Sequence, residues 1–227
     1  MPDAVMLFAA GLGTRMGTLT KDKPKPLIRV AGKPLIDHAM DFVKAISPAR
    51  VVANAHYKAD QIVDHFAGTD VQVSVESPDI LDTGGGLKAA LPLLKAHVVF
   101  TMNTDAVWDG PNPLDVLKAA WKDDMDALLL CVPMSQTVGR SSGNGDFDIT
   151  PDGLAHWGKD TVYSGVQIIR AEQVSNSPEN VFSLRAIWQE LEAKGRLHAV
   201  TYPGRWCDVG HPDGITLAED MLRSADV

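Results

Sequence analysis

The sequence lacks the features that mark several classes of protein. Its 227 residues include only two cysteines, Cys131 and Cys207, which form no Cys-x-x-Cys pair and have no histidine at metal-ligand spacing. We therefore expect reduced thiols in a cytoplasmic protein. No apolar run approaches the length of a membrane span, and the N-terminus lacks the basic start and cleavage site of a signal peptide, so no membrane partner is expected. The sequence shows no internal repeat and no low-complexity segment.

Positive charge is also in short supply. Lysine and arginine total 21 against 29 aspartate and glutamate residues, which gives a formal net charge of -8. A nucleic-acid-binding protein needs a basic face, so nucleic acid is not an expected partner. Phosphate ligands remain compatible with this charge, because a few local cations together with Mg²⁺ can reverse the field inside one cleft.

The segment from Val5 to Leu27 organises the rest of the chain. The apolar run Val5–Ala9 ends directly at a glycine-containing stretch and predicts a buried parallel strand. Gly11 and Gly13 permit backbone angles and close approaches that a side chain would prevent. Arg15 and a basic, proline-stiffened segment follow. A strand that opens into such a loop is suited to a polyphosphate, because backbone N–H groups and a bidentate arginine can bind its oxygens.

Two well-known phosphate loops fit this segment poorly. A dinucleotide-binding loop needs a third glycine at position 16, where the chain has Met16. A P-loop needs Gly-Lys followed by serine or threonine, and this sequence has no such ending. The alternative without function is a tight strand-to-helix turn beside a solvated basic loop.

Two linked motifs occupy the segment, Ala10-Gly-Leu-Gly-Thr-Arg-Met16 and Lys23-Pro-Lys-Pro-Leu27. Together they resemble the sugar-1-phosphate nucleotidylyltransferases, whose pattern is Ala-Gly-x-Gly-Thr-Arg-Met followed shortly by Lys-Pro-Lys-Pro-Leu. The resemblance implies a Rossmann-like, GT-A-like nucleotidyltransferase fold, with Arg15 and Lys25 as catalytic cations. It also implies that the nucleotide is contacted by Ala9, Ala10, Gly11, Gly13, Thr14, Arg15 and Lys25.

The order of the following elements predicts the fold class. The periodicity predicts a helix at 34–46, a strand at 50–54, a helix at 60–66 and a half-buried strand at 71–75. This order predicts an α/β protein with a doubly wound, mostly parallel sheet and ligands at the carboxyl ends of its strands. Short runs at 146–149 and 153–157 predict a small antiparallel, sugar-side extension. We expect one domain over 1–227, with a nucleotide-binding half at about 1–110 and a sugar-binding half at about 111–227.

A second glycine-rich stretch, Thr83-Gly84-Gly85-Gly86, precedes a helix predicted from Leu87. The family has a similar stretch whose backbone approaches the nucleobase, so the resemblance adds Thr83, Gly84 and Gly85 to the nucleotide contacts. The alternative is a flexible helix N-terminus with glycine at its cap. Glu76 and Asp82 are either ribose or sugar contacts or solvated loop acids, and the solvated interpretation is favoured for Asp82.

Two acids complete the predicted site. An apolar strand at 97–102 ends in Asn103-Thr104-Asp105, and a carboxylate at the end of a central strand faces the cleft. The alternative for Asp105 is a turn or helix cap. The segment 205–210 resembles the family's Trp-x-Asp-x-Gly-Thr, with His211 in place of the threonine. The resemblance implies that Asp105 and Asp208 hold catalytic Mg²⁺, an ion that prefers oxygen ligands. It also implies sugar contacts from Asn103, Gly145, Asp146, Ser164 and Gly165.

The implied reaction is attack by a sugar 1-phosphate on the α-phosphorus of a nucleoside triphosphate, with release of pyrophosphate. The nucleophile is already ionised, so catalysis reduces to positioning and charge neutralisation. Among short members of the family, the sequence looks most like N-acetylmuramate 1-phosphate uridylyltransferases. Open alternatives are a mannose-1-phosphate guanylyltransferase, a glucose-1-phosphate thymidylyl- or uridylyltransferase, a phosphocholine-type cytidylyltransferase and a non-catalytic nucleotide-sugar sensor. The sequence does not indicate the oligomeric state.

Overall fold

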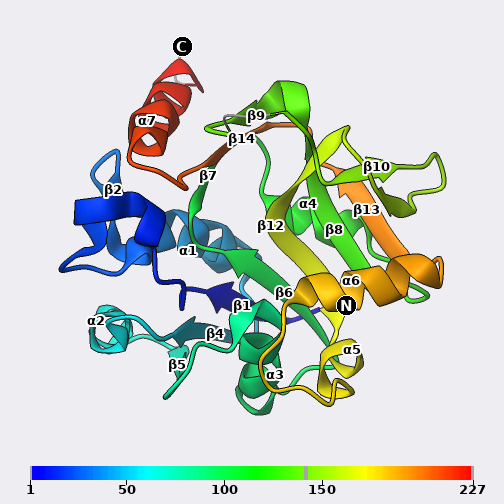
Figure 1. The fold of residues 1–227 in the computed structure, drawn as a ribbon, viewed down its shortest axis with the longest axis horizontal. Helices are drawn as coiled ribbons and strands as arrows, with labels where there is room; N and C mark the ends of the chain where they lie inside the picture. The colour runs from blue at the N-terminus through cyan, green and yellow to red at the C-terminus, as the bar shows by residue number, and fades with distance from the viewer. Residues whose placement is uncertain (1, 141–142, 226–227) are drawn as a thin grey trace.

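The computed structural model describes residues 2–140 and 143–225, and a nine-stranded sheet runs through it (Figure 1). Its strands are β1 (Ala4–Phe8), β4 (Arg50–Ala55), β5 (Val71–Val75), β6 (Val98–Asn103), β8 (Ala127–Pro133), β10 (Phe147–Ile149), β11 (Ala155–Trp157), β12 (Thr161–Arg170) and β13 (Leu197–Thr201). The order is β11-β10-β12-β6-β1-β4-β5, and β8 joins β12 to β13. Strands β6, β1, β4 and β5 are parallel, while β12 runs antiparallel to β6 and β8. The predicted α/β class and the predicted hairpin, now β10 and β11, are confirmed.

Helices cover both faces of this sheet. They are α1 (Leu35–Ile46), α2 (Ala59–Phe66), α3 (Asp82–Leu94), α4 (Pro113–Ala120), α5 (Ala171–Ser175), α6 (Leu184–Ala193) and α7 (Asp213–Ala225). Val5 and Leu7 of β1 face the core shared with α1, α2 and α4, while Ala4 and Met6 face the core shared with α3, α5 and α6. Figure 1 shows α3, α5 and α6 grouped beside one another. A strand buried on both faces needs apolar residues at every position, which explains the unbroken apolar run of β1.

A small second sheet, which the sequence did not predict, pairs a segment near the C-terminus with the segment that follows Asp105. It contains β7 (Ala106–Asp109), β14 (Arg205–Asp208) and β9 (Thr137–Val138), in the order β7-β14-β9. Helix α7 packs against it, and Met16 of the N-terminal loop shares that core with Val107 and Cys207. The remaining short elements are a two-stranded ribbon, β2 (Arg29–Val30) and β3 (Lys33–Pro34), and 3₁₀ turns at Thr14–Thr20, Lys25–Leu27 and Met134–Gln136.

The helix predicted from Leu87 begins at Asp82, so that prediction was wrong about Gly84, Gly85 and Gly86, which lie inside α3. These three glycines are buried because other parts of the chain press against them. A Cβ on Gly84 would overlap the Phe182 ring, and one on Gly85 would overlap the Asn180 carbonyl. The backbone N–H groups of Gly84 and Gly85 both donate to the Phe182 carbonyl, at 2.9 and 3.1 Å. Close packing therefore accounts for these glycines.

None of the helices in the described ranges combines the length and the apolar character that crossing a membrane requires.

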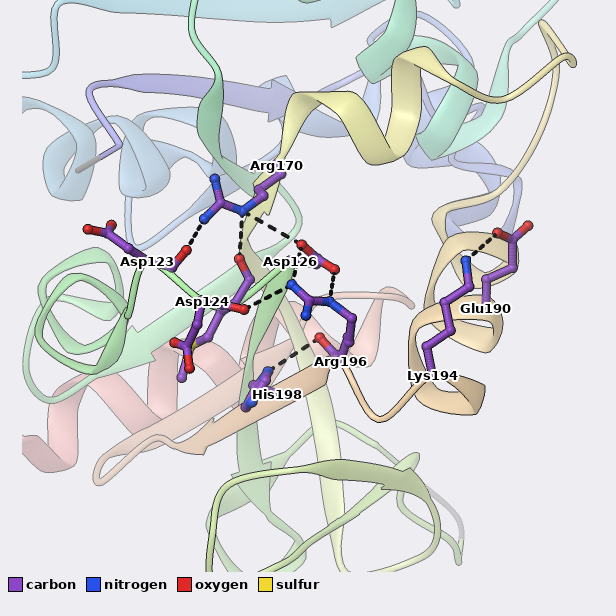
Figure 2. Close-up of polar contacts among 9 residues, drawn as sticks. Asp123, Asp124, Asp126, Arg170, Glu190, Lys194, Arg196 and His198 are labelled. Carbon is purple, nitrogen blue, oxygen red and sulfur yellow. Dashed lines mark hydrogen bonds and ion pairs between the residues drawn. The ribbon is translucent and has the colours of Figure 1, made fainter.

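A buried carboxylate ties together the ends of β8, β12 and β13 (Figure 2). Asp126 is 7% exposed and accepts hydrogen bonds from Nε and Nη2 of Arg196. Arg170 Nε lies 3.7 Å from the same carboxylate and donates to the Met125 carbonyl. Figure 2 also shows an exposed pair, Glu190 and Lys194, on α6.

We expect Asp126→Asn to lower the free energy of unfolding by about 2 kcal/mol, because it leaves two arginines without their charged partner. The matched control is Glu190→Gln, which removes an exposed pair and should change stability by less than about 0.5 kcal/mol. Urea denaturation of the three proteins measures both values. Equal stability of the Asp126 variant and the parent protein would show that the network contributes nothing.

Candidate active site

A cavity of about 220 Å³ lies at the carboxyl ends of the parallel strands. The N-terminal loop forms one wall with Ala9, Ala10, Gly11 and Lys25. The loop after β5 and the start of α3 contribute Glu76, Ile80, Asp82 and Thr83, and the end of β6 contributes Asn103, Thr104 and Asp105. Most of the residues predicted from the N-terminal motif and the strand-end acid therefore line one cavity.

The two glycines of the N-terminal loop have different environments. Gly13 has φ +63°, and a Cβ there would lie 2.9 Å from the Thr20 methyl group. Gly13 is therefore required by the turn itself. Gly11 is exposed and lines the cavity, and a Cβ there would meet no described atom within 4 Å. Folding places no such demand on Gly11, so its missing side chain leaves room for a ligand to approach the backbone.

A cation and an acid from distant parts of the chain meet in the cavity. Lys25 Nζ lies 2.7 Å from Asp105 Oδ2, and the lysine side chain is 9% exposed. Lys25 is held by the Lys25–Leu27 turn, while Asp105 lies two residues after the end of β6. Arg15 lies in the Thr14–Thr20 turn and is exposed.

The small sheet brings Asp208 to Asp105. Asp208 pairs with Ala106 in the β7–β14 ladder, and the backbone N–H of Val209 donates to the Asp105 carbonyl at 3.0 Å. Burial and the neighbouring charge of Asp105 raise the pKa of Asp208 above its ordinary value of 3.8. Lys25, Arg15 and Arg140 act on this pKa in the opposite direction. A Cβ on Gly210 would lie 3.0 Å from Asp208 Oδ2 and 3.3 Å from Arg15 Nη1, so Arg15 is near Asp208 as Lys25 is near Asp105.

The chemistry of these acids fits a hard divalent cation. In the described ranges no group of three or more histidine, cysteine, aspartate or glutamate residues gathers at metal-binding distance. The acids predicted to bind the metal are the two carboxylates of Asp105 and Asp208. Mg²⁺ is commonly held by one or two carboxylates, with waters and substrate phosphates as its other ligands. Burial, and after it the neighbouring charge of Asp105, disfavours the ionised form of Asp208, and a bound divalent cation would offset both effects.

Glu76 connects the two loops that line the cavity. This carboxylate is 3% exposed, and its oxygens accept from Asn54 Nδ2 at 2.6 Å and from the Leu81 N–H at 2.7 Å. Asn54 Oδ1 in turn accepts from the Ala9 N–H at 2.7 Å. A Cβ on Gly86 would lie 2.6 Å from the carboxylate, so that glycine admits Glu76. Asn54 was missed at the sequence level, because nothing in a strand residue indicates a partner in another loop.

Of the predicted sugar contacts, Asn103 lines the cavity and Gly165 lies against Asn103. Gly165 has φ +85°, and a Cβ there would lie 2.7 Å from the Asn103 amide group, so the two residues touch. Ser164 does not support its predicted contact, because it is 1% exposed and its hydroxyl donates to the Leu130 carbonyl at 2.7 Å.

The predicted contacts Gly145 and Asp146 also have partners within the protein. The Gly145 N–H donates to the Lys159 carbonyl at 3.0 Å. The Asp146 carboxylate accepts two hydrogen bonds from Arg140, at 2.9 and 3.0 Å, and one from the Tyr163 N–H at 3.0 Å. The sequence prediction missed Arg140, since a single arginine in a polar loop carries no motif.

Comparisons with known proteins identify a family and several relatives of the chain. Residues 5–200 match the model of a family described as MobA-like NTP transferase domain. The chain is 38% identical to an N-acetylmuramate alpha-1-phosphate uridylyltransferase from Caulobacter vibrioides, over 99% of this chain and 98% of the relative. It is 30% identical to one from Neisseria meningitidis, over 90% and 92% of the two chains.

Solved structures share the fold. The inositol-1-phosphate CTP transferase from T. maritima has a TM-score of 0.78 at 16% identity, with 97% of this chain and 96% of that chain covered. HddC from Yersinia pseudotuberculosis complexed with GMP-PN has a TM-score of 0.75 at 24% identity, with 96% and 99% covered.

Proposed function

Because the chain belongs to the MobA-like NTP transferase family, we propose that it transfers a uridylyl group from UTP to N-acetylmuramate α-1-phosphate, as part of cell-wall recycling. The products are the UDP-sugar and pyrophosphate. The substrate pair is that of the two relatives at 38% and 30% identity, which match nearly the whole chain. The single observation that supports the chemistry best is the convergence of Lys25, Asp105 and Asp208 beside the glycine loop.

The protein's part in this reaction is to align the two substrates and to neutralise the negative charges of their phosphates. A phosphate oxygen of the sugar attacks the α-phosphorus, and the bond from the α-phosphorus to the bridging oxygen breaks in line. Arg15 neutralises the departing pyrophosphate, and Lys25 neutralises the α-phosphate or the sugar phosphate. Asp105 and Asp208 would hold Mg²⁺, and the ion would supply further neutralisation of the phosphate charges. Since the attacking oxygen is ionised near neutral pH, no side chain has to remove a proton.

We extend the proposal to the other residues of the site. Ala9, Ala10 and Gly11 line the cavity and are assigned to the phosphates together with Gly13 and Thr14 of the same loop, and Thr83, which also lines the cavity, is assigned to the base and ribose. Gly84 and Gly85 act indirectly by letting α3 pack against the 180–182 segment. We assign Asn103 and Gly165 to the sugar, and we keep the division into a nucleotide-binding half at about 1–110 and a sugar-binding half at about 111–227 as part of the proposal, with Asn103 contributed to the sugar site from the first half. We place the reaction in the cytoplasm, in keeping with the two free, buried cysteines.

Pyrophosphate release tests the substrate assignment. The four common nucleoside triphosphates are combined with the 1-phosphates of N-acetylmuramate, N-acetylglucosamine, mannose and glucose, and with phosphocholine. We expect the highest kcat/KM for UTP with N-acetylmuramate 1-phosphate in the presence of Mg²⁺. A higher value for another pair would reassign the substrates, and no release with any pair would favour the sensor.

Glu76→Gln is expected to raise the KM for UTP about tenfold with a smaller effect on kcat. The amide replaces one acceptor oxygen by a donor, so it cannot accept from both Asn54 and Leu81, and the two loops lose their common anchor. Steady-state kinetics with each substrate varied in turn gives the values, and Asp79→Asn, an exposed acid on the same loop, is the matched control. If the KM values for UTP and for the sugar rise equally, Glu76 serves only the fold.

A further inference from the structure

Arg140 is a cation beside the candidate metal site that the reaction as proposed does not use. Val138 pairs with Cys207 in the small sheet, and a Cβ on Gly139 would lie 2.5 Å from the Asp208 carbonyl oxygen. The chain therefore passes directly along Asp208 before it reaches Arg140. The carboxylates of Asp146, which is bonded to it, and of Asp208 both raise the pKa of Arg140. The backbone contacts of Val138 and Gly139 thus hold Arg140 next to the segment that carries Asp208.

Asp146 fixes the direction of this guanidinium. The two side chains form a bidentate pair, with Nη1 to Oδ2 at 2.9 Å and Nη2 to Oδ1 at 3.0 Å. Asp146 Oδ2 also accepts from the Tyr163 N–H at 3.0 Å, which anchors the pair on β12. Two residues further along β12, Gly165 touches Asn103 at the edge of the cavity. Arg140 thus lies between Asp208 and the part of β12 that leads to the sugar side.

The pair leaves Arg140 able to bind an anion. A guanidinium has five N–H donors, and within the described residues Asp146 takes two of them. The arginine side chain is 31% exposed, so a ligand can reach it. An arginine whose orientation is already fixed loses little entropy when it binds a planar carboxylate.

The proposed sugar substrate carries, besides its phosphate, a second anionic group that the 1-phosphates of uncharged sugars lack. N-acetylmuramate has a carboxylate on its lactyl ether, on the same ring as the phosphate, and this group distinguishes it from N-acetylglucosamine. Arg15, Lys25 and the metal site already serve the phosphates. We propose that Arg140, held by Asp146, binds this carboxylate and selects the acidic amino sugar, an inference that rests on the proposed function.

The test compares two sugar phosphates in Arg140→Ala, with UTP and Mg²⁺ saturating. We expect kcat/KM for N-acetylmuramate 1-phosphate to fall about 30-fold, the loss of one charge-assisted pair, and that for N-acetylglucosamine 1-phosphate to change less than about threefold. If the neutral sugar phosphate is turned over too slowly, its inhibition constant against N-acetylmuramate 1-phosphate replaces kcat/KM. Arg140→Lys keeps the charge without the planar fork, so its kcat/KM for N-acetylmuramate 1-phosphate should lie between those of the parent protein and Arg140→Ala. Lys159→Ala, an exposed cation beside the same hairpin, is the control and should leave the ratio unchanged.

Equal losses with both sugar phosphates would overturn the inference, because they would mean that Arg140 binds the shared phosphate or only holds the hairpin. No loss with either sugar phosphate in Arg140→Ala would overturn it as well. In either case, turnover of N-acetylmuramate 1-phosphate by the parent protein would leave the proposed function standing. A parent protein that does not favour N-acetylmuramate 1-phosphate would overturn both.

Discussion

Asp208→Asn is expected to slow pyrophosphate release about 100- to 1000-fold while the fold stays intact. The amide keeps the shape of the side chain but removes one of the two negative charges that the structure offers to a divalent cation. The backbone contact from Val209 to Asp105, which sets the position of this segment, does not involve the side chain. Steady-state kinetics over a range of Mg²⁺ concentrations measures the loss, which we expect excess Mg²⁺ to reverse only in part.

The same substitution should leave metal-free protein as stable as the parent at neutral pH, or more stable. The pKa of Asp208 is raised in the folded protein, so the folded state holds this proton more tightly than the unfolded state. Ionised Asp208 therefore costs stability as the pH rises from about 3.8 through the raised pKa. Asp208→Asn removes that cost, and the difference between the two proteins should vanish at low pH. Thermal unfolding at pH 3 to 8 in EDTA measures the difference in stability between the two proteins. Near-parental activity of the variant, or its clear destabilisation at neutral pH, would remove Asp208 from the site.

Gly11→Ala is expected to raise the KM for UTP at least about tenfold without destabilising the protein. Gly11 lines the cavity, and a Cβ there meets no described atom within 4 Å. The added methyl group would then occupy space that the triphosphate needs. Because alanine restricts the unfolded chain, the free energy of unfolding should stay the same or rise by up to about 1 kcal/mol.

Gly13→Ala is the matched control in the same loop. Its φ of +63° and the 2.9 Å approach to Thr20 predict a loss of at least about 1 kcal/mol of stability. Urea denaturation and titration with a non-hydrolysable UTP analogue, applied to both variants, separate the two effects. Unchanged UTP affinity in Gly11→Ala would mean that the phosphates do not cross this part of the loop.

The sequence predicted the sheet and the strand-end acid because both depend on local pattern. Apolar runs followed by glycine or aspartate mark parallel strands and their ligand-facing ends, which located β1 and Asp105 correctly. For Asp208 the residue came from a motif, but the reason it reaches Asp105 is the pairing of β7 with β14, two short strands of four residues. Such short segments carry too little periodicity to predict a non-local pair.

The contacts that were missed or wrong depend on tertiary neighbours. Ser164 looked like a sugar ligand from its motif, yet its hydroxyl is used by the Leu130 carbonyl. The alternative interpretation of Gly84 was a flexible helix N-terminus, yet Phe182 packs against it, and a partner so distant in sequence cannot be read from the local pattern. The sequence does not mark Arg140, because its hydrogen bond to Asp146 and the nearby charge of Asp208 arise only in the folded chain. The roles of the site residues stay predictions until the variants are measured.

A metal-bound triphosphate is expected to lie over the glycine loop, between Asp105 and Asp208. Crystals soaked with a non-hydrolysable UTP analogue and Mn²⁺, with diffraction recorded at a wavelength where manganese scatters anomalously, test it most directly. We predict an anomalous peak about 2.1 Å from an oxygen of each carboxylate, with the triphosphate along Ala10 to Arg15. A peak away from either aspartate, or a triphosphate bound elsewhere, would contradict the claim.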